Sequence, residues 1–101
     1  QKHGGTTCGG VHIHPLNWTD FRPWRVSQML CREFRNYLGD KFEWQDADYE
    51  YEYDKLAIDL INGTASIRKW VETNGTLDDL LRLEDKGYNA YQSMRDNALL
   101  Y

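Results

Sequence analysis

Two histidines separated by one residue are the first candidates for chemistry in this sequence. His12 and His14 alternate with branched apolar residues, a pattern that predicts a half-buried first strand at 11–14 with both imidazoles on one side. Two imidazoles could share a metal ion, with Asp20 or Glu43 as a conceivable third ligand. Histidines on an exposed strand face are more often solvated or bonded to backbone, so we expect no metal and no cofactor.

An alternating run of acids and tyrosines is the second candidate. Most glycosidases use two carboxyl groups about 5 to 9.5 Å apart, and Glu50 and Glu52 have that spacing if they lie on one strand. Any two acids separated by one residue on a strand have this spacing. Glu50 and Glu52 are also expected to face water, so we predict no catalytic residue here. The interleaved rings are expected to form an edge layer of the core, with a sugar-stacking platform as the alternative; they are Tyr49, Tyr51 and Tyr53.

Length and composition predict one folded domain with a single core. The chain has 101 residues, of which 41% are hydrophobic, and it carries a formal net charge of -4. That charge and the lack of a Lys/Arg cluster argue against nucleic acid as a partner, and no apolar stretch is long enough to span a membrane. Cys8 and Cys31 could form a disulfide, but we favour a free Cys31 that packs on an apolar helix face.

The elements that must position these residues are marked by helix and turn signals. Apolar residues from about Arg22 follow helical spacing, with Pro23 in the first turn and Gly39 after the last. Residues 42–44 are predicted to form a second short strand. Residues 49–53 form a third extended segment, or alternatively a long loop.

Two further helices are predicted by their N-caps. Thr64 follows an Asn-Gly turn signal and precedes apolar residues at helical spacing, in a helix that Gly75 is expected to stop. Thr76 with Asp79 three residues later predicts a final helix, which Gly87 could kink or split. One apolar stripe runs along that helix: Leu77, Leu80, Leu81, Tyr88, Tyr91, Met94 and Ala98. The predicted fold class is therefore α+β, a small, mostly antiparallel sheet covered by about three helices.

Three ordered pieces of sequence also resemble a known family. They are residues 8–14 (CGGVHIH) running into 21–23 (FRP), residues 58–64 (IDLINGT) with 66–68 (SIR), and Arg95 before the terminal 99–101 (LLY). Their order, their spacing and the Leu-Leu-Tyr end resemble the C-terminal domain of the NamZ-type exo-β-N-acetylmuramidases, which are glycoside hydrolases. The resemblance covers nearly the whole chain.

The resemblance implies that residues 1–101 are a single C-terminal accessory domain of a larger enzyme. The catalytic carboxylates would belong to an N-terminal, Rossmann-like domain, so this chain alone is not expected to be catalytic. It would pack on that domain and form one wall of the cleft that binds muramic acid saccharides from peptidoglycan. The resemblance also implies a bacterial source and an extracytoplasmic location, either periplasmic or secreted.

The expected substrate contacts lie on residues 9–22. Gly9 and Gly10 allow close approach of the main chain to a partner domain or a sugar. His14 and Asp20 could hydrogen-bond sugar hydroxyls, and Arg22 could pair with the lactyl carboxylate. The simpler alternative is a surface ion pair between Arg22 and Asp20.

Two other functions remain open at this point. The chain could be a stand-alone module that binds a glycan or a protein without contributing to catalysis. An exposed patch that includes the three tyrosines would favour this hypothesis, and burial of their rings would remove its support. A metal-dependent enzyme built on His12 and His14 is a third hypothesis, and it requires a third ligand within reach.

Overall fold

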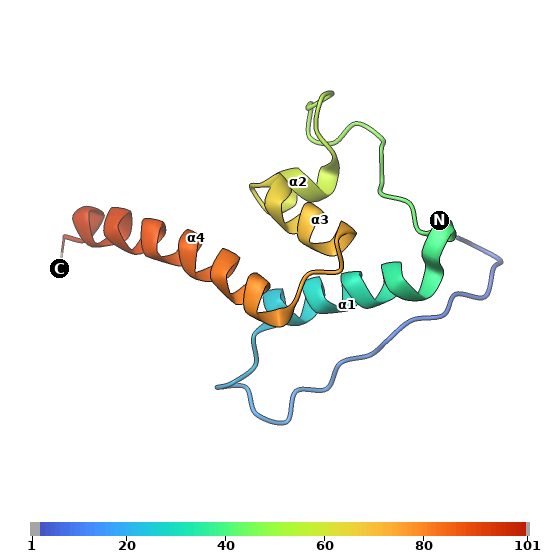
Figure 1. The fold of residues 1–101 in the computed structure, drawn as a ribbon, viewed down its shortest axis with the longest axis horizontal. Coiled ribbons are helices and arrows are strands. Elements are labelled where there is room, and N and C mark those ends of the chain that lie inside the picture. The colour runs from blue at the N-terminus through green and yellow to red at the C-terminus, as the bar shows by residue number, and fades with distance from the viewer. Residues whose placement is uncertain (1–2, 101) are drawn as a thin grey trace.

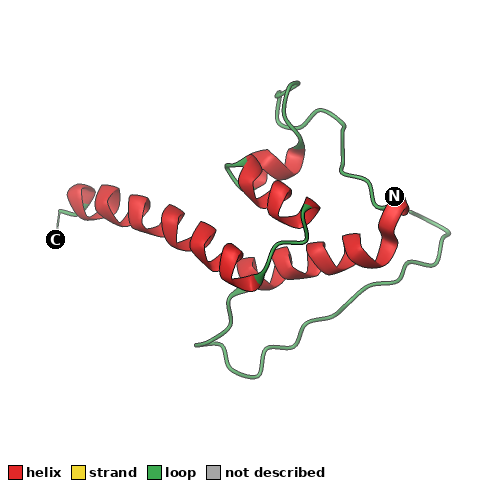
Figure 2. Cartoon of the chain, viewed as in Figure 1, coloured by secondary structure: helices red, strands yellow, loops and turns green. Residues whose placement is uncertain are grey.

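The computed structural model describes residues 3–100 as a set of helices joined by long loops (Figure 1). The helices are α1 (Pro23–Leu38), the short 3-10 helix η1 (Gly39–Lys41), α2 (Ala57–Ile61), α3 (Ala65–Glu72) and α4 (Leu77–Ala98). Within the described residues no sheet is present, and the one β-type pairing is an isolated bridge between Tyr49 and Glu52 (Figure 2). The predicted α+β fold with an antiparallel sheet is therefore wrong.

The first two predicted strands are extended loops because neither has a neighbouring strand. Val11 and Ile13 are both exposed, in a long segment that runs ahead of α1. Phe42 packs edge-to-face on Trp44 with ring centroids 4.9 Å apart, so contact between the rings orders the second segment. Period-two alternation gives a strand only where another strand accepts its backbone hydrogen bonds.

The tyrosine segment is a tight turn at the end of a loop. Glu50 and Tyr51 both have positive φ, 51° and 66°, which reverses the chain between the bridge residues Tyr49 and Glu52. The three tyrosines therefore do not share one face of a strand, and the alternative of a long loop describes this segment better. Tyr51 is 89% exposed and Tyr53 is 72% exposed.

The predicted starts of α1, α3 and α4 are confirmed, because each depends on residues beside it in the chain. Helix α3 ends at Glu72, before the Gly75 that was expected to stop it, and the short helix α2 was not predicted. Pro23 opens α1, and the N–H of Gly39 donates to the carbonyl of Arg35 at its end. Thr64 caps α3 by accepting from the N–H of Ser66. Thr76 and Asp79 form a reciprocal capping box at the start of α4, and α4 continues without a break through Gly87.

A small core lies where α1, α3 and the first turns of α4 meet. Helix α3 contacts the three other α-helices, which places it at the centre of the packing. Its buried side chains meet one buried leucine from α4, and the cluster consists of Ile67, Trp70, Val71 and Leu80. The indole of Trp70 also donates to the carbonyl of Thr76 at 2.8 Å, so one side chain ties α3 to the start of α4. No helix in residues 3–100 is long and apolar enough to cross a membrane.

Candidate functional site

The histidine pair lies on the loop before α1. The rings of His12 and His14 are in contact, with centroids 4.0 Å apart, and both side chains are exposed. The expectation that the two imidazoles lie together is met without a strand. Across residues 3–100, however, no three His, Cys, Asp or Glu side chains are grouped so that they could hold a metal ion. The third ligand that a metal-dependent enzyme would require is therefore not found there.

A polar turn precedes the first residue of α1. The side-chain amide of Asn17 donates to Asp20 at 2.6 Å, and its oxygen accepts from the N–H of Thr19 at 3.0 Å. The guanidinium of Arg22 donates through Nη1 to the carbonyl of Thr19 at 2.8 Å. Arg22 makes no ion pair with Asp20, so the simpler alternative of a surface pair is wrong.

The two predicted binding glycines lie at the other end of α1. Gly9 and Gly10 line a hollow of about 370 Å³ together with Phe34, Tyr37 and Leu38 from the last turns of that helix. A 16-residue helix is about 24 Å long, so the glycines and Arg22 are separated by most of that length. The predicted site residues therefore follow one long strip and do not converge on a single pocket.

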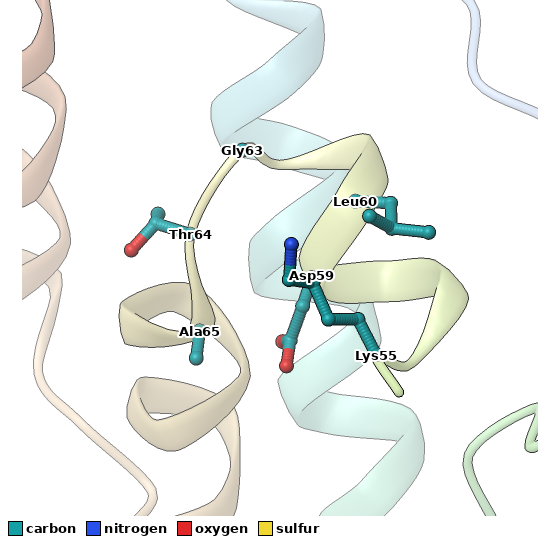
Figure 3. Close-up of a pocket in the computed structure, with 6 residues that line it drawn as sticks. All are labelled: Lys55, Asp59, Leu60, Gly63, Thr64 and Ala65. Atoms are coloured by element: carbon teal, nitrogen blue, oxygen red, sulfur yellow. The ribbon is translucent and has the colours of Figure 1, made fainter. Parts of the chain in front are cut away.

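A larger hollow, of about 430 Å³, lies beside the turn that joins α2 to α3 (Figure 3). Its polar groups come from Lys55, Asp59 and Thr64, and the hydroxyl of Thr64 points away from the carboxylate of Asp59. Both oxygens of Asp59 accept from Nε of Arg68 at 3.0 Å. The carboxylate is already bound within the chain, so this hollow has no convergent set of catalytic groups.

Arg68 is the centre of an ion network that the sequence did not indicate. Besides Asp59 it binds Glu72 at 3.1 Å, and Glu72 in turn accepts from the indole of Trp44 at 3.0 Å. Hydrogen bonds to Asp59, and then to Glu72, raise the pKa of Arg68 above its already high value, so the guanidinium remains charged. The network ties α2, α3 and the loop after η1 together.

Asn62 connects α1 with the turn between α2 and α3. Its side-chain oxygen accepts from the indole of Trp24 at 3.0 Å and from the amide of Gln28 at 3.2 Å. Its own amide donates to the carbonyl of Ile58, and Gly63 follows with a φ of 66°. Most polar residues of the 58–68 motif therefore hold helices together.

Both cysteines are free thiols in the structure. Cys8 is exposed on the first loop, and Cys31 packs at the edge of the core on α1. Burial raises the pKa of the Cys31 thiol, which keeps it protonated at neutral pH. The alternative of a disulfide between them is wrong, and the interpretation of Cys31 as a packed thiol is confirmed.

Comparison with known families gives one match. A family model described as "Exo-beta-N-acetylmuramidase NamZ, C-terminal" matches residues 1–101, the whole length of the chain. Searches of curated proteins and of solved structures returned no match. Of the three motifs that carried the resemblance, only Tyr101 of the Leu-Leu-Tyr end lies outside the described residues. The chain belongs to the family of C-terminal domains of the NamZ exo-β-N-acetylmuramidases.

Proposed function

We propose that this chain is the accessory domain of a peptidoglycan-processing exo-β-N-acetylmuramidase. It packs on a catalytic domain of the same polypeptide and forms one wall of the cleft that binds the terminal muramic acid. The observation that carries the proposal is the family match over all 101 residues. Ligand sites commonly form between domains, which supports a contribution of this domain to the cleft.

The state of two partly buried acids supports a role outside catalysis. Asp59, with a side chain 12% exposed, is bound by Arg68 through both oxygens. Glu84 is only partly exposed and accepts from Nε and Nη2 of Arg25 at 2.9 and 2.8 Å. A general acid in a glycosidase needs a carboxyl group that can hold and release a proton at the scissile bond. Carboxylates held by arginine serve the packing of the helices instead.

The exposed strip before α1 supplies the proposed contacts to the sugar. Arg22 uses Nη1 for the carbonyl of Thr19, and within residues 3–100 its Nε and Nη2 donate to no protein acceptor. Those two N–H groups suit a bidentate contact with the lactyl carboxylate of muramic acid. Asp20 and His14 are exposed on the same loop and would contact hydroxyl groups. Gly9 and Gly10 would face the partner domain.

The location of the enzyme follows from the proposed substrate. Peptidoglycan fragments arise outside the cytoplasmic membrane, so we place the whole enzyme in the periplasm or the medium of a bacterium. Fractionation of the source cells checks this assignment: the enzyme should be recovered with the extracytoplasmic fraction.

Kinetics with a chromogenic β-N-acetylmuramic acid substrate test the cleft wall. In the full-length enzyme, Arg22→Ala should raise KM about tenfold or more, the equivalent of one lost charge-assisted contact, and leave kcat within about twofold. Arg82→Ala is the matched control, because Arg82 is an exposed arginine on α4 in an exposed pair with Asp79. Equal hydrolysis by the catalytic domain with and without this chain would show that it contributes no wall.

A stand-alone binding module is the second candidate, and the exposure of the tyrosine turn favours it. Tyr51 and Tyr53 present their rings to solvent at the tip of a loop, where a sugar ring or a protein could stack on them. Titration of nitrogen-15-labelled chain with a muramic acid disaccharide distinguishes the two functions. Shifts confined to residues 49–53 favour the module, shifts in residues 9–22 favour the cleft wall, and no shift at millimolar sugar removes the glycan-binding form of the module.

A further inference from the structure

Helix α4 has two halves with different surroundings. In its first turns, Leu80 is fully buried against α3, with 0% of its surface exposed. The helix then leaves the body of the molecule and projects into solvent (Figure 1). Three residues on the same face of this projecting half are exposed at 59%, 60% and 72%: Tyr88, Tyr91 and Met94. We call these three residues the distal stripe.

The distal stripe continues the apolar face that makes the core. At 100° per residue, it lies on the side of α4 that carries Leu80, so it continues the face that packs on α3. Tyr88 still borders a hollow that Trp24 and Ile67 also line, and Tyr91 and Met94 follow it along the helix. The charged neighbours of the stripe are Glu84, Asp85, Lys86, Arg95 and Asp96. Glu84 is already paired with Arg25, which leaves two acids and two bases. This balance of charge fits an apolar protein surface better than a charged ligand.

The accessible surface of the chain is larger than that of a compact domain of the same mass. The chain exposes 8643 Å², whereas a compact monomer of 12.0 kDa exposes about 6,000 Å². Its radius of gyration is 16.6 Å, against about 13 Å for a compact domain of this length. Among residues 3–100, 17 large hydrophobic side chains are exposed and 5 apolar side chains are buried. Permanent interfaces remove about 2,000 to 5,000 Å² counted over both partners, so an excess of about 2,600 Å² on one partner corresponds to the upper end of that range.

The projecting half of α4 is also too short to be stable as an isolated helix. Residues 88–98 of α4 follow Gly87, and helices of about that length are marginal in water without tertiary contacts. Gly87 itself lowers helix stability relative to alanine. A covering surface would therefore stabilise residues 87–98 as a helix.

A second copy of the chain does not account for the exposed area. A two-fold dimer covers one patch on each copy, and a stripe of three side chains is far smaller than 2,600 Å². Exposed apolar residues also occur on the loop before α1, at Leu16 and Trp18, and at the end of α1, at Tyr37. A domain joined to this chain can cover several such surfaces at once.

We propose that the distal stripe packs against an apolar surface on the catalytic domain of the same polypeptide. This inference rests on the proposed function, which supplies that domain, and it adds the surface through which the two domains are joined. Helix α4 then acts as an arm that reaches from the small core onto the catalytic domain. Its first turns belong to one domain and its last turns to the interface.

Hydrogen exchange on the full-length enzyme tests the arm. Residues 87–98 should exchange about tenfold or more slower than an uncovered helix, and Tyr91→Lys should remove that protection. Asn89→Lys is the matched control, because it adds the same charge two residues away on the opposite face of α4. Met94→Lys, on the stripe, provides an independent second variant.

The outcomes separate the arm from the proposed function. Fast exchange of residues 87–98 in the wild-type enzyme, or protection that Tyr91→Lys and Met94→Lys leave intact, would overturn the arm. Protection that disappears on dilution would also overturn it, because it would indicate a second copy as the partner. Protection that both stripe variants remove in a protein without muramidase activity would support the arm and overturn the proposed function.

Discussion

At the scale of single residues, Asn62 makes hydrogen bonds to another helix that its place in an Asn-Gly turn does not indicate. Its side-chain oxygen accepts one hydrogen bond from the indole N–H of Trp24 and another from the side-chain amide of the buried Gln28. Both donors come from α1, more than 30 residues earlier in the sequence. Loss of that acceptor would leave two partly or fully buried donors without a partner, and such groups are costly.

Asn62→Ala should therefore lower the free energy of unfolding by about 1–3 kcal/mol. Urea unfolding followed by the fluorescence of the four tryptophans measures the change. Asn89→Ala, on the exposed side of α4, is the control and should change stability by no more than about 0.5 kcal/mol. Equal stability of the two variants would mean that Asn62 does not hold α1 to the turn.

At the scale of elements, each helix end is set by contacts within a few residues. The capping box of α4 is the clearest case, since the hydroxyl and the N–H of Thr76 both donate to the carboxylate of Asp79. These hydrogen bonds, with a smaller contribution from the charge of Arg82, hold the pKa of Asp79 below its ordinary value. The start of α4 is therefore sensitive to acid.

The sign of this pH dependence follows from the lowered pKa. An acid with a depressed pKa in the folded state contributes stability above its unfolded pKa of about 4, and that contribution is lost as the pH falls through the folded value. Asp79→Asn should thus destabilise the protein at neutral pH, and its difference from wild type should shrink in acid. Thermal unfolding between about pH 2 and pH 7 measures this.

Asp78→Asn is the matched control for the capping box. Asp78 lies one residue earlier in the same first turn, but its carboxylate makes none of the hydrogen bonds that Asp79 makes with Thr76. It should show a weaker dependence on pH than Asp79→Asn. The same pH profile for both variants would assign the effect to the helix dipole and not to the box.

Two glycines on either side of the core should respond to alanine in opposite ways. A Cβ at Gly75 would overlap the indole ring of Trp70, which is itself buried, so Gly75→Ala should cost about 1–3 kcal/mol of stability. A Cβ at Gly87 meets open space inside α4, so Gly87→Ala should stabilise by about 1 kcal/mol. Thermal unfolding of the two variants measures both changes. A destabilised Gly87→Ala would mean that α4 needs flexibility at Gly87.

At the scale of the whole molecule, the chain is a small core with two uncovered extensions. One is the loop of residues 3–22, and the other is the projecting half of α4 (Figure 1). Both carry exposed apolar side chains, and together they explain why the surface exceeds that of a compact domain. The composition predicted a chain that folds around one core by itself. The small buried cluster shows that much of the apolar content is directed outward.

The family and the starts of the three longer helices could be predicted from sequence, whereas the short helix α2 and the arrangement of the candidate site could not. The order of the three motifs identified the family that matches all 101 residues. The residues expected to bind substrate, Gly9, Gly10, His14, Asp20 and Arg22, remain a prediction. Their distribution along the length of α1 was not predictable, because spacing along a loop does not give its path in space.

The sequence by itself determined where α1, α3 and α4 begin. Pro23, Thr64 and the Thr76–Asp79 pair act through hydrogen bonds and fixed dihedrals within about four residues, so neighbours in the chain suffice to specify them. Only the tertiary structure decided whether alternating residues would become strands and which apolar stripe would be covered. Both outcomes depend on partners distant in sequence or in another domain, and local pattern carries no information about whether such a partner is present.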